Sequence, residues 1–432
     1  MPRVLLLLPS TTYRAEAFLE AACKLGLDIT VGLERTAVLI DRPQFDWLAL
    51  NFSEPERCAD AVVEYAHSHP IHAVLGVDDA TAVLASHLAA ALKLPHNSID
   101  SVSAARNKYR MRTRLHEHGV PVPRFIRCSI FDNPVAIAEQ VSYPCVLKPL
   151  TLSASCGVIR ANDPSELAAA FQRVTSLLHR LGVVKAGETG RQLLVEDFVP
   201  GREVALEGLL TNGFLRVLAL FDKPDPLDGP FFEETIYVTP SRLSSAVQGR
   251  IAACAEQAAA ALGLREGPIH TELRVNDEGV WIIEMAARSI GGRCSTALRF
   301  ATDLSLEELI LRHALRMDLP SFDRERGAAG VMMLPIPRGG ILRDIHGLED
   351  ARAVPGIEEV TITTEVGEVL VPLPEGTRYL GFMIARSAAP DEVEAALRQA
   401  HERLTFSIDD SNKTQDRATQ EQPDHGVQSI RF

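Results

Sequence analysis

The 432-residue chain is too long for one ordinary domain and predicts about two to four of them. Its hydrophobic fraction of 46% and charged fraction of 23% exclude a mainly disordered, collagen-like or disulfide-scaffold protein. With 44 basic and 57 acidic residues, the net charge of −13 disfavours non-specific binding to nucleic acid or to an anionic membrane, but a local basic pocket could still hold an anionic ligand.

The cysteines and the N-terminus indicate a cytoplasmic protein. The seven cysteines are scattered and form no C-x-x-C pair, which favours reduced thiols over disulfides or a zinc site. The apolar run at residues 4–8 is ended by Pro9 and is too short for the core of a signal peptide. No stretch approaches the ~18 apolar residues of a membrane helix, so we expect no membrane segment.

The first hundred residues alternate short apolar runs with alanine-rich helical patterns. Strands are predicted at 4–8, 29–33 and 73–77, and helices at 14–24 and 82–92. Strands that alternate with helices are typical of a doubly wound parallel sheet. The first strand is not followed by G-x-G-x-x-G, so the usual dinucleotide fingerprint is missing.

The following segments mix helices with further strands. We predict a basic helix at 107–118, a strand at 143–149 and a helix at 163–182 with Asp163 as its N-cap. Strands at 193–199 and 204–210 and a helix at 244–262, ended by Gly263, are predicted to follow. A smaller unit starts near Gly330 and contains a helix at 390–404. The polar segment 411–432 is predicted to be a flexible tail.

Two alternating runs, 270–275 and 280–284, flank a turn with a glycine and predict a β-hairpin. With a three-residue loop at 277–279 and Gly279 in the left-handed position, Glu272 lies directly opposite Glu284. The alternation then defines one polar face with His270, Glu272, Arg274, Ile282 and Glu284. It defines an apolar face with Leu273, Val275, Trp281, Ile283 and Met285.

The facing acids are the candidate metal site. Like charges roughly 5 Å apart destabilise a strand pair unless a cation neutralises them. Hard divalent cations prefer carboxylate oxygens, so Glu272 and Glu284 could hold one. The alternative is a solvated strand face on which Arg274 balances the two acids.

Basic residues on both sides of this hairpin are candidate anion ligands. Arg288 and Arg293 flank a Gly-Gly pair, and guanidinium groups bind phosphate or carboxylate bidentately. Lys148 ends an apolar strand and precedes the small residues 151–158, whose backbone could approach phosphates without being a Walker A loop. The alternatives are an exposed basic helix start for the arginines and a surface lysine at a strand end.

The strand–turn–strand segment at 193–203 completes the set. Glu196 and, seven residues later, Glu203 could serve a planar base and a ribose. The alternative is an edge strand with exposed acids.

The order of these features resembles the ATP-grasp superfamily over about residues 101–320. Within it the chain most resembles the L-amino acid ligases, which are dipeptide-forming carboxylate–amine ligases. This narrower match rests on Asp222-Lys223-Pro224, Phe232-Glu233-Glu234, Pro240-Ser241 and Glu284-x-x-x-Arg288-x-x-Gly291-Gly292.

The resemblance implies an ATP-grasp fold that combines α/β and α+β parts. It places an N-terminal doubly wound α/β (pre-ATP-grasp) domain at 1–100 and the small lid lobe at 101–190. The catalytic lobe is expected at 191–329 and a small C-terminal α+β lobe at 330–410, before the tail.

The resemblance also implies residue roles. ATP phosphates are expected on Lys108, Lys148, Ser153, Ser155 and Gly157. The adenosine is expected on Glu196, Phe198, Val199 and Glu203. Mg²⁺, or Mn²⁺, is expected on Glu272 and Glu284. The catalytic and substrate-contacting residues are expected to be Arg288, Glu234, Tyr237 and Arg293. Many members of the superfamily have an asparagine, a further metal ligand, where this chain has Ala286, so the number of metal ions stays open.

The implied reaction is ADP-forming amide synthesis from a small-molecule carboxylate and an amine, with amino acids as the expected substrates. Phosphorylation of the carboxylate gives an acyl phosphate, which the amine then attacks. We expect no nucleic-acid or membrane partner, and a homodimer is expected by analogy. The alternatives are an ATP-grasp ligase for a carboxylate that is not an amino acid and a non-catalytic nucleotide-binding protein.

Overall fold

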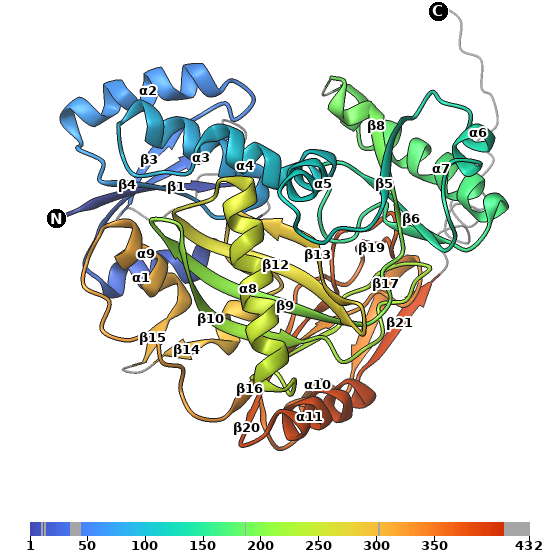
Figure 1. Cartoon of the computed structure of the whole chain (residues 1–432). Coiled ribbons are helices and arrows are strands. Elements are labelled where there is room, and N and C mark those ends of the chain that lie inside the picture. The colour runs from blue at the N-terminus through green and yellow to red at the C-terminus, as the bar shows by residue number, and fades with distance from the viewer. Residues whose placement is uncertain (10–11, 13, 35–44, 186, 301–302, 410–432) are drawn as a thin grey trace, which may run out of the picture.

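The computed structural model describes residues 1–9, 12, 14–34, 45–185, 187–300 and 303–409 (Figure 1). The predicted tail at 411–432 lies outside these ranges. Among the helices of the described part, none is both long and apolar enough to cross a bilayer.

The N-terminal domain is the predicted doubly wound sheet. Its strands run parallel in the order β3-β2-β1-β4. Alternate side chains of β1 enter two cores, because Val4, Leu6 and Leu8 pack with α1 while Leu5 and Leu7 pack with α2 and α3. The elements are β1 (Arg3–Leu8), α1 (Ala15–Lys24), β2 (Asp28–Leu33), β3 (Asp46–Ala49), α2 (Pro55–Ser68), β4 (Ala73–Gly76) and α3 (Asp79–Ala91).

A small lobe contains an antiparallel sheet in the order β5-β8-β6-β7, covered by α7. As predicted, Asp163 caps α7, and its carboxylate accepts hydrogen bonds from the backbone N–H groups of Ser165 and Glu166. The elements are β5 (Phe125–Ser129), α6 (Pro134–Ala138), β6 (Cys145–Pro149), β7 (Ile159–Ala161), α7 (Pro164–Arg180), η1 (Val183–Lys185), η2 (Thr189–Arg191) and β8 (Gln192–Asp197).

The rest of the chain is built on one eight-stranded sheet in the order β13-β12-β9-β10-β11-β16-β20-β18. Its first half comprises β9 (Arg202–Thr211), β10 (Phe214–Asp222), β11 (Ile236–Thr239), β12 (Gly267–Asn276) and β13 (Gly279–Ala286). Three helices pack on this half, namely α4 (Ile99–Arg106), α5 (Lys108–Glu117) and α8 (Ser245–Leu262).

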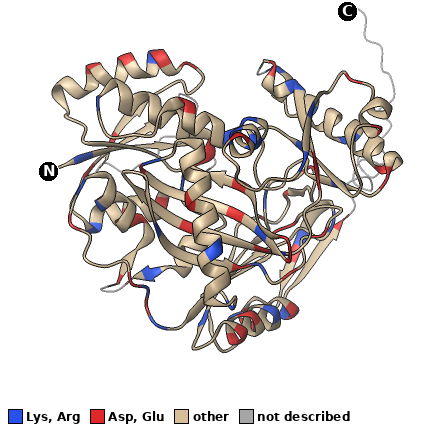
Figure 2. Cartoon of the chain, in the orientation of Figure 1, with Lys and Arg blue, Asp and Glu red and all other residues tan. Residues whose placement is uncertain are grey.

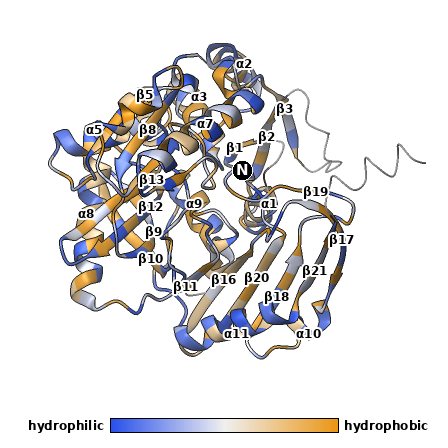
Figure 3. Ribbon diagram, turned by 90° about the vertical axis from the view of Figure 1, so that its right-hand side faces the viewer, coloured by the Kyte–Doolittle hydropathy of each residue, from blue (hydrophilic) through white to orange (hydrophobic). Residues whose placement is uncertain are grey.

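The second half of the sheet forms the C-terminal lobe, which Figure 3 views with α10 and α11 beside it. It comprises β16 (Ala328–Leu334), α10 (Leu348–Arg352), β18 (Ile357–Ile362), β20 (Gly381–Ser387) and α11 (Pro390–Arg403). A separate sheet contains β17 (Gly340–His346), β19 (Val369–Leu370) and β21 (Thr405–Asp409). Between the two halves lie η3 (Cys294–Ala297), β14 (Arg299–Phe300), β15 (Leu304–Ser305) and α9 (Leu306–Ala314).

The structure shifts three expected domain boundaries. Helices α4 and α5 pack on the large sheet rather than in the small lobe, because their apolar faces meet α8. Strand β8 pairs with β5 and β6 and so belongs to the small lobe, although the boundary was expected at 190. Strand β16 crosses the expected boundary at 329–330 and pairs with both β11 and β20, so the C-terminal lobe continues the catalytic sheet.

Candidate functional site

A cavity of about 820 Å³ lies where the N-terminal domain, the small lobe and both halves of the large sheet meet. In Figure 2, acidic and basic segments lie along the central strands that form its floor. The N-terminal domain contributes Asp79, the small lobe Lys148, the β12–β13 hairpin Glu272 and Glu284, and the C-terminal lobe Tyr379.

The predicted pairing of Glu272 with Glu284 is confirmed, but the register by which it was reached is wrong. Asn276 pairs with Gly279, so the loop has two residues, and Arg274 faces Trp281. The Asn276 side chain fixes this turn by accepting hydrogen bonds from the backbone N–H groups of Glu278 and Gly279. A β-bulge between the turn and the acids then restores the Glu272–Glu284 pair.

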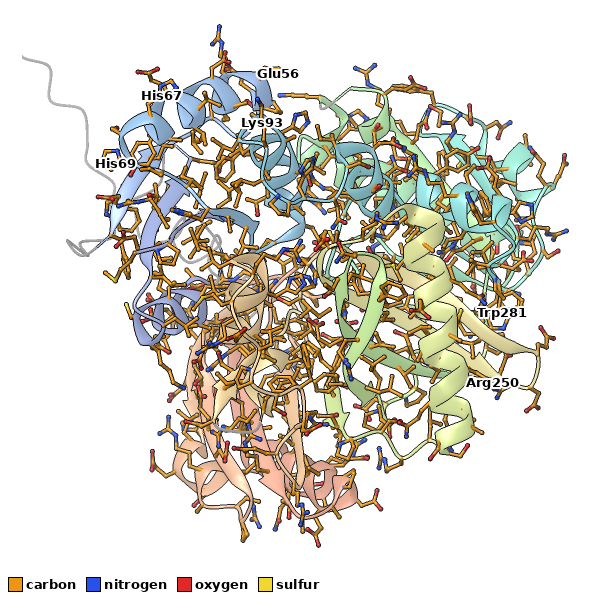
Figure 4. All side chains as sticks on the ribbon, turned by 60° about the vertical axis from the view of Figure 1, so that its left-hand side comes forward. Glu56, His67, His69, Lys93, Arg250 and Trp281 are labelled. Carbon is orange, nitrogen blue, oxygen red and sulfur yellow. The ribbon has the colours of Figure 1, made fainter. Side chains whose placement is uncertain are left out.

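The bulge also corrects the predicted faces of β13. Ile282 is fully buried in the core beside Leu273, not on the polar face. Ile283 lines the cavity instead of the core. Figure 4 labels Trp281 at the outer end of the hairpin, away from the centre of the molecule.

Both facing acids contact cationic or ionisable groups in the cavity. Glu284 Oε1 lies 3.1 Å from Lys108 Nζ, and Glu272 Oε1 lies 3.3 Å from Lys223 Nζ and 3.6 Å from His270 Nε2. Arg274 does not balance them, because it turns to Glu203. Two partly exposed carboxylates on neighbouring strands are a donor set that fits a hard divalent cation.

A second acidic group adjoins Glu272. Ligand oxygens of Glu203, Glu234 and Glu272 all lie within 4.8 Å of one another. Lys223 Nζ holds the three together, at 2.8 Å from Glu203, 2.7 Å from Glu234 and 3.3 Å from Glu272. Although burial opposes its charge, the three carboxylates raise the pKa of Lys223 well above its ordinary value. A fixed ammonium therefore neutralises this group from within.

Glu234 and Tyr237 lie together on the cavity wall. Tyr237 donates its hydroxyl to Glu234 Oε1 at 2.7 Å. Burial raises the pKa of the Glu234 carboxyl, with Lys223 opposing and Glu272 adding to that shift. Burial also raises the pKa of Tyr237 well above its ordinary value, so the phenol stays a hydrogen-bond donor.

Lys148 and Glu196 form a buried pair in the small lobe. Lys148 Nζ contacts Glu196 Oε1, and Arg112 donates to the same carboxylate through Nε at 2.8 Å and Nη2 at 3.2 Å. Burial raises the pKa of Glu196, but the two cations outweigh it and hold that pKa at about 2. Burial also lowers the pKa of Lys148, which Glu196 counteracts. Glu196 thus anchors the lysine that we expect to meet ATP phosphates.

The adenosine candidates lie at the next edge of the cavity. Glu203 Oε2 accepts from Arg274 Nε at 2.8 Å, and Arg274 Nη1 donates to the Val199 carbonyl at 2.7 Å. The Phe198 ring stacks on Phe232, with centroids 6.4 Å apart, and both rings line the cavity. An aromatic pair can pack on the base of a nucleoside, and a neighbouring carboxylate can accept hydrogen bonds from its ribose hydroxyls.

The small-residue loop splits into two parts. Ser153 and Ser155 line the cavity, whereas Gly157 is not among its described lining residues. The Gly157 N–H donates to the Pro374 carbonyl of the C-terminal lobe at 2.8 Å. Gly157 has φ +72°, and a Cβ there would come within 2.8 Å of Pro149, so its role is to let the loop turn.

The two candidate arginines separate. Arg288 lines the cavity and donates through Nη2 to Asp79 Oδ2 at 2.8 Å. Arg293 is absent from the described lining and binds Glu359 of β18 through both Nη atoms, at 2.5 and 3.0 Å. The expectation that Arg293 acts on substrate is therefore not supported by its placement.

Sequence reasoning assigned no site role to three residues that line the cavity, Arg14, Asp79 and Arg274. It also assigned none to Arg112 and Lys223, which bind the lining acids Glu196 and Glu203. Their partners lie 71 residues away for Arg274, 84 for Arg112 and 209 for Asp79. Arg112 could have been found from the predicted basic helix, where it lies one turn after the candidate phosphate ligand Lys108.

Three family models match separate parts of the chain. The ATP-grasp N-terminal domain matches residues 19–96, the ATP-grasp domain residues 141–297, and the L-amino acid ligase C-terminal domain 2 residues 332–409. The chain has the ATP-grasp fold. The regions matched correspond to the N-terminal α/β domain, the nucleotide lobes and the C-terminal lobe described above.

Known proteins agree with this assignment. The crystal structure of L-amino acid ligase from Bacillus licheniformis superposes with a TM-score of 0.83 at 26% identity, covering 95% of this ATP-grasp protein and 99% of that chain. An uncharacterized protein of Sinorhizobium fredii is 24% identical over 94% of this chain and 84% of its own length. Alanine–anticapsin ligase of Bacillus subtilis is 26% identical over 49% of this chain, and the match spans about half of that ligase, 47%.

Proposed function

We propose that this ATP-grasp protein is an ATP-dependent carboxylate–amine ligase that joins two amino acids and releases ADP and phosphate. The observation that carries the proposal is the cavity itself. One cavity combines the opposed acids Glu272 and Glu284, the cations Lys108, Lys148 and Arg288, and a wall from the L-amino acid ligase C-terminal domain.

The first step is transfer of the γ-phosphoryl group of ATP to a substrate carboxylate. Phosphoryl transfer depends on positioning and on neutralising charge, which Lys108, Lys148 and Arg288 supply. Glu272 and Glu284 would hold Mg²⁺, which supplies further neutralisation of the phosphate oxygens. Glu196 acts indirectly here, by fixing Lys148.

The adenosine is expected at the opposite edge. The Val199 carbonyl is already engaged by Arg274, so its N–H is the group proposed to meet the base. Phe198 and Phe232 would contact the ring, and Glu203 would meet the ribose.

The second step is attack of the amine on the acyl phosphate, which forms the C–N bond and expels phosphate. Glu234 and Tyr237 are proposed to face the amino-acid substrate. Water must be kept out, because it would hydrolyse the acyl phosphate. Ser153 and Ser155 from the small lobe and Thr377 and Tyr379 from the C-terminal lobe line the cavity from two sides.

The test is ADP release against a panel of amino-acid pairs, with mass spectrometry of the products. We expect turnover that requires two amino acids and yields a dipeptide. Turnover with one carboxylate that is not an amino acid would instead support the alternative ligase, and ATP binding without turnover would support a non-catalytic protein. A homodimer stays a prediction.

The metal assignment has its own variant. Glu284→Gln should abolish ADP release and weaken binding of Mn²⁺, measured by electron paramagnetic resonance in the presence of ADP. Glu278→Gln is the matched control, because Glu278 is an exposed acid in the turn of the same hairpin. Normal turnover of Glu284→Gln would overturn the assignment.

A further inference from the structure

The N-terminal domain reaches the cavity at the end of β4, where the chain turns into α3. Asp79 is the first residue of α3 and follows the N-cap Asp78. Its carboxylate accepts the 2.8 Å hydrogen bond from Arg288 Nη2, and both side chains line the cavity. This carboxylate is therefore bound by a residue that is proposed to act on the acyl phosphate.

Two further properties favour an ionised Asp79. Burial opposes ionisation, but Arg288 and then Lys108 hold the pKa of the Asp79 carboxyl below its ordinary value. Asp79 also lies in the first turn of a 13-residue helix, where the helix dipole stabilises negative charge. A charge-assisted bond between an ionised carboxylate and a guanidinium is about twice as strong as a neutral one.

A second set of contacts also joins the N-terminal domain to the segment that carries Arg288. Arg14 is buried and donates to the Val77 carbonyl through Nη1 and to the Ser289 hydroxyl through Nη2. Its guanidinium also lies 3.6 Å from Asp78. Arg288 itself donates through Nη1 to the Ser289 carbonyl at 2.9 Å. The backbone after β13 and the Arg288 side chain are thus both fixed by the N-terminal domain.

We propose that Asp79 is a positioning residue of the ligase reaction, which fixes the Arg288 guanidinium where the substrate carboxylate is phosphorylated. The proposal rests on the proposed function. It gives the N-terminal domain a part in the chemistry that requires no contact with ATP. Small displacements of a reacting group cost up to about 100-fold in rate, so loss of this restraint should be visible in kcat.

The test is Asp79→Asn, which keeps the size of the side chain and removes its charge. We expect kcat to fall about 10- to 100-fold, the KM for ATP to change less than twofold, and the ratio of ADP to dipeptide to rise, because a poorly held acyl phosphate is hydrolysed. Asp79→Glu should recover part of the loss. Asp100→Asn is the matched control, since Asp100 pairs with Arg110 and Arg114 on the surface. The thermal midpoint of each variant is measured alongside.

A double-mutant cycle separates this role from a structural one. Amino-acid affinity is measured by calorimetry with a non-hydrolysable ATP analogue, which does not depend on turnover. We expect Asp79→Asn to weaken binding in the native background and to have no further effect in the Arg288→Ala background. Equal effects in both backgrounds would overturn the proposal.

Two other outcomes are informative. If Asp79 instead bound the substrate ammonium, its substitution would cost nothing with a carboxylate that lacks the amino group, and that result would also overturn the proposal. If native protein binds the ATP analogue but no amino acid and shows no turnover with any pair, the proposed function fails. The inference about Asp79 fails separately, when native protein is active and Asp79→Asn equals it.

Discussion

Lys223→Met is the sharpest test of how the acidic floor of the cavity is held together. Lys223 is buried and contacts Glu203, Glu234 and Glu272. Methionine has a similar volume and no charge. The substitution leaves three carboxylates whose oxygens lie within 4.8 Å of one another and removes the cation that they share.

The magnitude follows from Coulomb's law. Two unit charges at this separation repel by about 3.5 kcal/mol at an effective dielectric constant of 20. Removing one partner of a buried ion pair costs about 3–5 kcal/mol, because the other charge stays buried. We therefore expect the free energy of unfolding to fall by about 3–5 kcal/mol at neutral pH.

The pH dependence has a definite sign. The pKa of the Glu234 carboxyl is already raised by burial, and without Lys223 it rises further above its value in the unfolded chain. The folded state then binds more protons, so stability increases as the pH falls through this raised pKa. The deficit of Lys223→Met relative to the native protein should narrow from pH 7 to pH 5.

A divalent cation should replace the missing ammonium. The chain has two tryptophans, and Trp281 lies on the β12–β13 hairpin that carries Glu272, so urea unfolding is followed by its fluorescence in a Trp47→Phe background. Mn²⁺ at 100 times its dissociation constant would restore about 2.7 kcal/mol. Lys93→Met is the control, because Lys93 is exposed and substitution of a surface side chain changes stability by about 0.5 kcal/mol or less. An unchanged stability, or a deficit that Mn²⁺ and acid leave untouched, would refute the reasoning.

Three further predictions concern the walls of the cavity. Glu196→Gln should lower the free energy of unfolding by roughly 3 kcal/mol at pH 7, because the pKa of Glu196 in the folded state is about 2. This loss of stability should persist down to about pH 5 and shrink only below it, and thermal unfolding that shows no loss at pH 5 would contradict the prediction. Arg173→Ala breaks the bidentate pair with Glu375, at 2.5 and 2.8 Å, which joins the small lobe to the C-terminal lobe, so the ratio of ADP to dipeptide should rise. Arg274→Ala removes the support of Glu203 and should raise the KM for ATP about tenfold or more, with kcat at saturating ATP little changed.

The fold was largely predictable because its local signals agree with its packing. The strand at residues 4–8 is apolar on both faces, which is the sequence pattern of a parallel strand buried between two helical layers. The Asp163 cap and the Gly263 end of α8 lie where they were predicted. Domain boundaries were less predictable, because the sequence of strand β16 would be the same whether the strand starts a new lobe or extends the existing sheet.

The site was predictable where it depends on one hairpin and unpredictable where it depends on distant segments. The Glu272–Glu284 pair follows from alternation across a short turn, although the bulge before it does not. Asn276 was the overlooked signal, because an Asn side chain that binds the next N–H groups selects the shorter loop. Lys223 gave no such signal, because its charge is matched by three acids from separate segments. These are Glu203 of β9, Glu234 of the loop before β11, and Glu272 of β12, and only the folded sheet brings them together.

Part of the acidic surplus behind the net charge of −13 lies in the cavity. The described cavity lining contains eight acidic and six basic side chains, and Lys223 adds one cation beneath it. This balance disfavours ATP alone, because a tetra-anion would enter a surface that is already slightly negative. A divalent cation on Glu272 and Glu284 would reverse the sign where the phosphates are proposed to lie, while Lys148, held by Glu196, supplies a positive charge that does not depend on metal. The acidic surplus of the cavity therefore predicts that nucleotide binding depends on the cation.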